Sequence, residues 1–557
     1  MLDYGASGAG DRSDTSSIQT AMKACAAAGG GTVLFPPGRY LTGTLFLHNN
    51  VGLYLSAGAT LLGSANLADY PARRPSFPAT TGGAYTEKSL IYGEKLENIS
   101  IEGHGTIDGQ GMRFERTQYG RPHLIRFSEC RNVCVRGVTL KNSAMWVQHY
   151  LACTEILIEG IRVTSHANFN NDGIDIDGCE RVRIANCDID SGDDAVVLKS
   201  GGRRITRDVT VTNCVIRSTC NALKAGTESN GGFENIAFNN CTIRDTRLAG
   251  LALEVVDGGT LNGLVASNIT MNGVGAPLFI RLGDRARPIP PGSVPQPAGS
   301  VSNILIDNVF ATHAGAVGCS ITGLPSHPVR NVSLSNLRLI FDGGGKREEA
   351  GRPVPELPKA YPEFSMFGSL PAYGFYCRHA AGLRFSNVQT AFANSEGRPA
   401  LFCEDVDGLR ISAAHFAAAA DGAPSIVLDG ARNVTVENCL ADRQSVFLSV
   451  KGSDTQAITL LANDLHLAKS PLAVGKEVKT GAVFTAANRG LGDKEAKVRF
   501  GPSPGLRPPS PTGRGLKTET VGTRLREYRR KNKDCSPLPS GEGGPAFGFA
   551  QDKLCGG

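Results

Sequence analysis

The sequence predicts an all-β fold, a single-stranded parallel β-helix in which each coil stacks on the preceding one. The first observation is a short repeat, because the pairs Asn186-Cys187, Asn213-Cys214 and Asn240-Cys241 recur every 27 residues. The second is a longer series of apolar residues that recurs at steps of 23–28 residues over most of the chain. The third is the composition, since 68 Gly and 6% aromatic residues are typical of a chain with many turns.

Each repeat contains a strand pattern V/I/L-x-V/I/L, preceded by Asn or Gly. A coil of about 25 residues is suited to three short strands, and paired strands lie about 4.8 Å apart. Asn is expected at the sharp turns, because it tolerates a left-handed backbone better than other residues with a side chain. A leucine-rich solenoid is excluded because its LxxLxLxxN frame is absent. The repeat residues are Val133, Ile156, Val182, Val209, Ile236, Leu264, Ile304, Val332, Leu383, Leu409, Val434 and Ile458.

A helix is expected before the repeats, from Asp14 to Ala28. Ile18, Met22 and Cys25 lie at helical spacing. The run Gly29-Gly30-Gly31 ends the helix, because Gly is favoured just past a helix C-terminus. We expect this short N-terminal helix to cap the open end of the stack, where strand edges are otherwise bare.

The repeats predict one β-helix domain over residues 1–499. Residues 500–557 form a Pro/Gly/Arg-rich segment that cannot bury much apolar surface, so we interpret them as a disordered tail. One explanation of this tail is an imperfect gene model that reads through the natural stop codon. From Arg499 onward there are 11 Lys and Arg against 5 Asp and Glu, which accounts for the whole net charge of +6.

The neutral body and the absence of long apolar runs exclude two classes of partner. Nucleic-acid binding requires a basic face on the fold itself, and none is indicated. No apolar run reaches about 18 residues, so no membrane span is predicted. The residues after Met1 contain no basic region followed by an apolar stretch, so no signal peptide is predicted either.

The 15 cysteines do not indicate a metal site. No CxxC pair occurs, which argues against zinc. Cys187, Cys214 and Cys241 lie at the repeat spacing, which predicts a column of small side chains buried in the core. We predict neither a metal nor a cofactor.

Three acidic residues form the candidate reaction centre. We align the strands that contain Ile174 and Val196 and take these two side chains as pointing inward. In this alignment Asp172 lies on one coil, and Asp193 and Asp194 lie on the next. Neighbouring carboxylates raise one another's pKa, and a protonated acid beside a carboxylate is the equipment that cleaves a glycosidic bond. On residues alone, Asx turns and a calcium site remain alternatives. Consecutive aspartates in a strand face opposite ways unless the backbone bends.

Two long insertions are expected to border the same face as Asp172. They are Gly283–Ser300, which is rich in proline, and Asp342–Ala372. Long loops on a rigid scaffold commonly bind a ligand.

Several motifs carry a family resemblance, which extends from about Asp3 to about Asn488. The sequence is similar to glycoside hydrolase family 28, the polygalacturonase and rhamnogalacturonase group. The resemblance implies a right-handed parallel β-helix and hydrolysis with inversion, with Asp193 as the general acid and Asp172 and Asp194 holding and activating the water. The motifs are Asp3-Tyr4-Gly5-Ala6, Gly29-Gly30-Gly31-Thr32-Val33, Asn142-Ser143-Ala144-Met145-Trp146, Asn170-Asn171-Asp172-Gly173-Ile174-Asp175 and Gly192-Asp193-Asp194.

The sequence resembles a divergent member, because two binding motifs of the family are missing. The family's Gly-His-Gly falls at Cys220-Asn221-Ala222, and its Arg-Ile-Lys falls at Ala252-Leu253-Glu254. Asn221 and Glu254 therefore occupy positions implied to bind substrate, while Lys224 and Arg281 on neighbouring coils are candidates for the lost positive charge. The alternatives are an Arg281–Glu254 salt bridge and a solvated Lys224.

The combined interpretation is a polygalacturonase-like hydrolase of O-glycosidic bonds in a pectic or related uronate-containing polysaccharide or oligosaccharide. A non-catalytic glycan-binding β-helix and a polysaccharide lyase on the same architecture remain alternatives. We expect a monomer whose partner is the glycan, with no nucleic acid and no membrane. The family resemblance implies an exported protein, periplasmic or extracellular.

Overall fold

The computed structural model describes residues 1–81, 86–116, 120–419, 423–443 and 446–491. The chain divides into two units, Met1–Lys497 and Val498–Gly557. The predicted tail at 500–557 lies outside the described residues, and the following account concerns the first unit.

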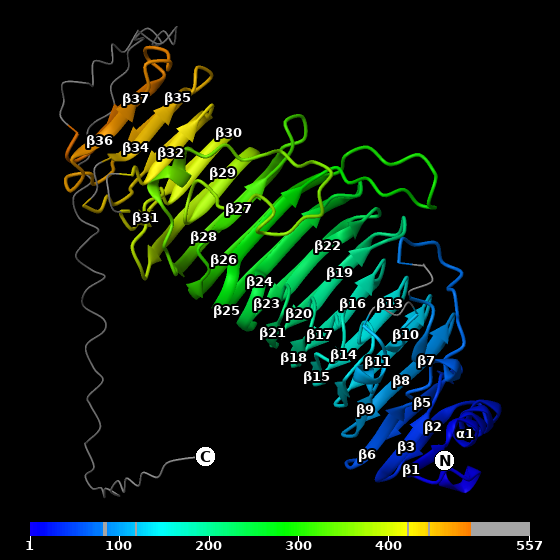
Figure 1. The fold of residues 1–557 in the computed structure, drawn as a ribbon. Coiled ribbons are helices and arrows are strands. Elements are labelled where there is room, and N and C mark those ends of the chain that lie inside the picture. Colours follow the sequence, from blue (N-terminus) through cyan, green and yellow to red (C-terminus); the bar gives the residue numbers. More distant parts are fainter. Residues whose placement is uncertain (82–85, 117–119, 420–422, 444–445, 492–557) are drawn as a thin grey trace, which may run out of the picture. The chain divides into compact units, whose positions relative to one another are not determined.

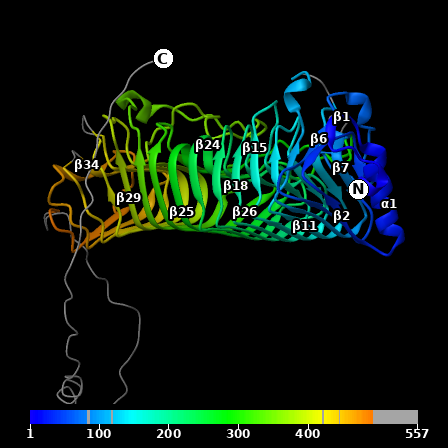
Figure 2. The same cartoon turned by 90° about the horizontal axis from the view of Figure 1, so that it is seen from below.

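The described strands stack in three columns, and the strands within each column pair in parallel (Figures 1 and 2). Column A contains β4 Leu45–Phe46, β7 Ser89–Glu94, β10 His123–Ser128, β13 Gln148–Leu151, β16 Ile174–Asp177, β19 Val196–Ser200, β22 Leu223–Ser229, β27 Cys319–Thr322, β32 Ile426–Asp429, β34 Val446–Lys451 and β36 Ser470–Val474. Column B contains β2 Gly31–Phe35, β5 Val51–Leu55, β8 Glu97–Gly103, β11 Arg131–Arg136, β14 Thr154–Glu159, β17 Glu180–Ala185, β20 Thr206–Thr212, β23 Phe233–Asn239, β33 Arg432–Glu437, β35 Gln456–Leu461 and β37 Val483–Ala486.

Column C contains β1 Ala9–Ser13, β3 Gly38–Thr42, β6 Ala59–Gly63, β9 Thr106–Asp108, β12 Thr139–Lys141, β15 Arg162–Ser165, β18 Asp188–Ser191, β21 Val215–Ser218 and β31 His415–Phe416. Longer strands contribute to more than one column, namely β24 Thr242–Val255, β25 Thr260–Leu282, β26 Ser300–Ala314, β28 Val329–Phe341, β29 Phe375–Phe392 and β30 Leu401–Ser412. Short 3-10 helices are η1 Leu2–Tyr4, η2 Leu67–Asp69, η4 Gly111–Arg113 and η5 Arg347–Gly351.

The strand register confirms the predicted repeat. Val133 lies opposite Ile156, and Val182 lies opposite Val209 on the next coil. The register also holds across the two insertions. Leu264 lies opposite Ile304, and Val332 lies opposite Leu383. The repeat residues therefore form one continuous row in column B.

Asparagines occupy the sharp turns beside column B, as expected. Asn186, Asn213 and Asn240 have φ values of 59°, 55° and 55°, which lie in the left-handed region. Their side chains form a ladder, because the amide of Asn213 donates to Asn186 at 3.3 Å and that of Asn240 to Asn213 at 2.7 Å. The same residues thus provide the turn conformation and a bond between coils.

The N-terminal helix α1 runs from Thr15 to Ala27, within one residue of the predicted bounds at each end. Its buried face contains Ile18 and Met22, and the helix contacts β2, β4 and β5. In Figure 1 it lies beside the first coils.

The interior of the stack is a continuous apolar core. Ile174, Val196 and Leu223 belong to this core, so the predicted inward column is confirmed. Cys187, Cys214 and Cys241 are buried in the same core as free thiols, which also agrees with the prediction.

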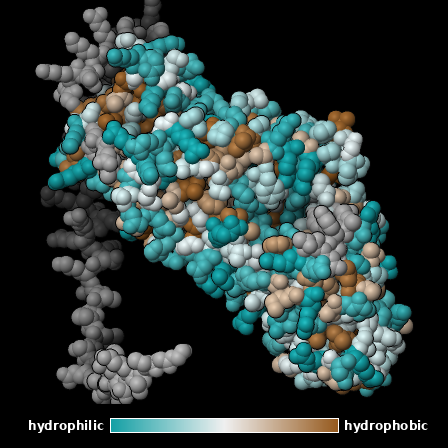
Figure 3. Space-filling view, in the orientation of Figure 1, coloured by the Kyte–Doolittle hydropathy of each residue, from teal (hydrophilic) through white to brown (hydrophobic). Residues whose placement is uncertain are grey.

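The surface drawn in Figure 3 is largely hydrophilic, with separate small hydrophobic patches. Among the described residues, no helix has the length and apolarity needed to cross a membrane.

Candidate active site

The three predicted acids lie where turns lead into adjacent strands of column A. Asp172 precedes β16, while Asp193 and Asp194 precede β19, and the two strands are paired. The backbone amide of Gly173 donates to the carbonyl of Asp194 at 2.8 Å, so the two turns are directly bonded. The structure therefore brings the three acids together on neighbouring coils, outside the apolar core.

Asn171 holds the turn that presents Asp172. Its side-chain amide donates to the carbonyls of Ser143 and Met145 at 3.0 Å, and its oxygen accepts from the amide of Asn168 at 3.1 Å. The motif residues around Ser143 thus anchor the turn that carries Asp172, so the two sequence motifs are bonded to each other in the structure.

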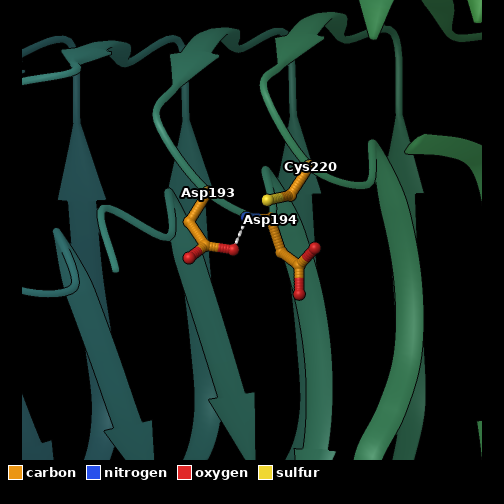
Figure 4. Close-up of side chains that lie close together, drawn as sticks. All are labelled: Asp193, Asp194 and Cys220. Carbon is orange, nitrogen blue, oxygen red and sulfur yellow. Dashed lines mark hydrogen bonds between the residues drawn. The ribbon is translucent and has the colours of Figure 1, made fainter. Parts of the chain in front are cut away.

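Asp193 and Asp194 are consecutive, yet their carboxyl groups extend in the same direction from the turn (Figure 4). Residues 192–195 form an irregular turn between β18 and β19 rather than part of a strand. The Asp194 amide donates to Asp193 Oδ1 at 2.9 Å, and the hydroxyls of Ser191 and Ser218 both donate to the Asp193 carbonyl at 2.6 Å. These bonds stabilise the bend that places both acids on one side.

The environments of the two consecutive acids move their pKa values in opposite directions. Burial and the charge of Asp194 raise the pKa of Asp193. Burial also acts to raise the pKa of Asp194, but Lys224, Lys199 and hydrogen bonds from Asn221 outweigh burial and lower it. At a pH between the two values, Asp193 holds a proton while Asp194 is ionised.

Asp172 resembles Asp193 in its electrostatics. Its side chain is almost fully buried, with 4% of its surface exposed. Burial and the charges of Asp175 and Asp193 raise the pKa of Asp172. Protonation is therefore shared within a group of close carboxyls rather than confined to one residue.

Lys224 occupies the centre of the site and is not solvated. Its Nζ lies 3.1 Å from Asp194 and 3.4 Å from Glu254. Asn221 completes this arrangement, because its side-chain amide donates to Asp194 at 2.8 Å. Three of the four predicted binding residues therefore lie around Asp194.

Arg281, the fourth, points elsewhere. It lies opposite Glu254 in the register, but no ion pair joins the two side chains. Instead its guanidinium donates to the backbone carbonyls of Gly323 and Glu356 at 3.2 and 2.7 Å. The alternative of an Arg281–Glu254 salt bridge is therefore wrong. The side chain is completely buried, and the geometry favours a structural position.

Both insertions reach the site, as predicted. From the first, Arg287 pairs with Glu228 at 3.0 Å, and Glu228 pairs with Lys199 at 3.2 Å. From the second, the Tyr361 ring lies 5.8 Å from the Nζ of Lys224. Glu363 lies beside the same lysine, and burial raises the pKa of Glu363 to about 7.

Several residues of the site were missed by sequence reasoning. Lys199 contacts Asp172 and Asp175 at 3.7 and 3.5 Å as well as Glu228. The alternation within β19 gave a signal for Lys199, which lies two residues after Val197 on the outward side. No comparable signal marks Tyr361 or Glu363, because an irregular loop has no periodicity from which to infer an orientation.

The ligand atoms of Asp193, Asp194 and Cys220 lie within 4.8 Å of one another. A thiol with two carboxylates does not suit Ca²⁺, which takes six to eight oxygens. We therefore derive no metal chemistry from this cluster.

Comparisons with known proteins agree with the geometry. The profile of the family described as glycosyl hydrolases family 28 matches residues 72–355. A probable polygalacturonase of Vitis vinifera is 28% identical over 378 residues, which cover 62% of this chain and 75% of that protein. An exopolygalacturonase of Platanus acerifolia is 26% identical and covers 62% of this chain and 90% of its own length.

A solved structure supports the same relationship. The hyperthermoactive exopolygalacturonase from Thermotoga maritima matches with a TM-score of 0.52 and 25% identity, covering 61% of this chain and 86% of that chain. The chain is thus a glycoside hydrolase built from stacked parallel β-strands. It belongs to glycosyl hydrolases family 28. Tyr361 and Glu363 lie just beyond the matched residues.

Proposed function

We propose that this protein hydrolyses O-glycosidic bonds in a pectic or related uronate-containing polysaccharide or oligosaccharide, with inversion of configuration. The names of the relatives from Vitis vinifera, Platanus acerifolia and Thermotoga maritima support a polygalacturonase-like substrate. The observation that carries the proposal is the placement of Asp172, Asp193 and Asp194 on two hydrogen-bonded turns of adjacent coils, where the pKa of Asp193 is raised and that of Asp194 is lowered.

In the proposed reaction, Asp193 donates its proton to the glycosidic oxygen as the bond from the anomeric carbon to that oxygen breaks. Asp194 and Asp172 hold a water on the opposite face of the sugar, and the ionised carboxylate of Asp194 accepts one of its protons. The water oxygen forms the new bond to the anomeric carbon. The product sugar therefore has the opposite anomeric configuration, and one water is consumed for each bond cleaved.

The remaining binding residues surround this centre. Asn221 and Lys224 stabilise the ionised form of Asp194, and Glu254 holds Lys224 from the other side. In this proposal Asn221, Lys224 and Glu254 face the bound sugar, whereas Arg281 supports the loop backbone.

The finer features of the fold and its setting form part of the same proposal. Family membership supports a right-handed coil, and the contacts of α1 with the first strands support its capping role. We propose one β-helix domain over residues 1–499 and a monomer that is exported to act on its glycan.

The test is release of reducing ends from a panel of pectic glycans by the full chain and by Asp193→Asn. We expect the wild type to cleave at least one member and the variant to lose about 10²–10⁴-fold in kcat. Equal activity in both would reject Asp193 as the acid. Binding without turnover would favour the glycan-binding alternative, and an unsaturated product that absorbs ultraviolet light would favour a lyase.

A further inference from the structure

The lysines at the reaction centre are neutralised by the protein itself. Lys199 has three carboxylate partners, Asp172, Asp175 and Glu228, at 3.2–3.7 Å. Its side chain and that of Lys224 are 7% and 2% exposed. A substrate carboxylate that approached either lysine would have to displace a carboxylate of the protein.

The arginines that the first insertion brings to the site are neutralised in the same way. Arg285 lies 2.6 Å from Asp257, and Arg287 lies 3.0 Å from both Asp257 and Glu228. The insertion thus closes a network in which each of these four cations already has an acidic partner. None of them is a free receptor for an added anion.

The site also holds acidic groups beyond those that the cations neutralise. Glu254 is fully buried, and burial raises its pKa to about 8 despite the ion pair with Lys224. Glu363 approaches the same lysine from the second insertion. The side chains of Glu254 and Glu363 lie near Asp194 and Lys224, so an added carboxylate would compete with three carboxyl groups of the protein for that one lysine.

We propose that the sugar bound at the reaction centre carries no free carboxylate: it is a neutral sugar, or a uronic acid whose carboxyl group is esterified. This inference rests on the proposed function and names the substrate class for the same site. Its physical basis is the desolvation cost of a buried anion, which is repaid only by an unneutralised cation or by hydrogen-bond donors.

Arg247 is the candidate binding residue for the free carboxylate of a sugar next to the reaction centre. It is exposed, and its guanidinium donates to the carbonyl of Thr219 at 2.6 Å and to the sulfur of Cys220 at 3.5 Å. No ion pair with a carboxylate forms at Arg247 among the described residues. It lies one coil beyond the Cys220 turn, so an acidic sugar is expected at a position next to the centre.

The experiment compares three substrates with the full chain: free polygalacturonate, the same polymer methyl-esterified, and a pectic backbone that contains neutral sugars. We expect kcat/KM to be at least about 10-fold higher on one of the two uncharged types than on free polygalacturonate, because a free carboxylate would compete with the protein's own carboxylates for Lys199 and Lys224. Comparing the esterified polymer with the neutral-sugar backbone shows whether the sugar at the centre is an esterified uronic acid or a neutral sugar.

Isosteric variants test the cause of the selectivity. In Glu363→Gln, the preference for the uncharged substrate is expected to fall at least about 3-fold through a lower KM on free polygalacturonate. The matched control is Asp245→Asn, because this carboxyl lies on the exposed surface and pairs only with Arg244 among the described residues. The control is expected to keep the wild-type preference.

One result would overturn the inference while leaving the hydrolase proposal intact, namely equal or better turnover of free polygalacturonate by the wild type. If no glycan is cleaved, the hydrolase proposal fails instead. Calorimetry of Asp193→Asn with esterified and free oligomers then decides the inference, because tighter binding of the free oligomers contradicts it.

Discussion

Two edges of the same coils carry turns that repeat from coil to coil but differ in residue type and in backbone conformation. At the first edge, Asn186, Asn213 and Asn240 form an exposed ladder of neutral amides. At the second, the equivalent turns of successive coils present Asp172, Asp194 and Asn221, and a network of buried charges covers them. The repeat determines where a turn residue lies, and the residue type decides whether the position contributes to stability or to chemistry.

The two edges differ in solvent exposure, and this difference sets the strength of their interactions. The amides of the ladder lie in water, where each hydrogen bond contributes only about 0.5–1.5 kcal/mol. Asp194 is only 6% exposed, so its interaction with Lys224 acts in a medium of lower dielectric constant. Turns that repeat from coil to coil therefore carry weak, repeated bonds at one edge and strong, unequal pKa shifts at the other.

The largest expected effect comes from removing the acid at the charged edge. Asp193→Asn cannot donate the proton, so we expect kcat to fall by about 10²–10⁴-fold while the fold is retained. Kinetics on a cleaved substrate and circular dichroism measure the two quantities. Asp245→Asn at an exposed turn is the control, and a comparable loss there would mean that the effect is not specific to the site.

The next effect concerns stability at the charged edge. Lys199→Met leaves Asp175 and Glu228 buried beside an apolar side chain, so we expect the free energy of unfolding to fall by about 3–5 kcal/mol. Urea denaturation measures this change. The exposed pair Arg74–Glu87 supplies the control, because Arg74→Met is expected to cost less than about 1 kcal/mol. Equal losses would contradict the contrast between buried and exposed charges.

A smaller effect is expected at the amide ladder. Asn213→Ala puts Ala at a φ of 55° and removes bonds to two neighbouring coils, so we expect a loss of about 1–2 kcal/mol. Asn213→Gly removes the same bonds without the steric cost and is expected to lose less. Thermal denaturation of both variants checks the order, and a larger loss for Gly would show that backbone conformation is not what the Asn provides.

The smallest effect is a shift of the pH profile. Asn221→Ala removes one hydrogen bond to Asp194, so the pKa of Asp194 rises. Because Asp194 acts in its ionised form, the acidic limb of kcat/KM moves to higher pH, by less than about one unit. A shift to lower pH would contradict the role of Asp194 as the ionised partner.

The sequence was a good guide wherever periodicity applied. The rows of Val182 and Val209, the inward column of Ile174 and Val196, and the asparagine turns all follow from spacing, because a parallel stack repeats its register from coil to coil. The position of the acids on adjacent coils follows from the same rule.

Spacing carried no information about contacts made outside the repeat. The partners of Arg281 are backbone carbonyls near Gly323 and in the second insertion, so its position beside Glu254 in the register was misleading. The approach of Glu363 to Lys224 depends on how an irregular loop folds back over the strands. Such contacts are determined by three-dimensional packing and not by a local sequence pattern.

The central claim is that Asp193 protonates the departing sugar while Asp194, in the same turn, and Asp172, in the neighbouring turn, direct water to the opposite face. The most direct test is proton nuclear magnetic resonance of the first product formed from a cleaved oligosaccharide. The account predicts that the new reducing end first appears with the anomeric configuration opposite to that of the bond cleaved. A first product with the same configuration as that bond would contradict it.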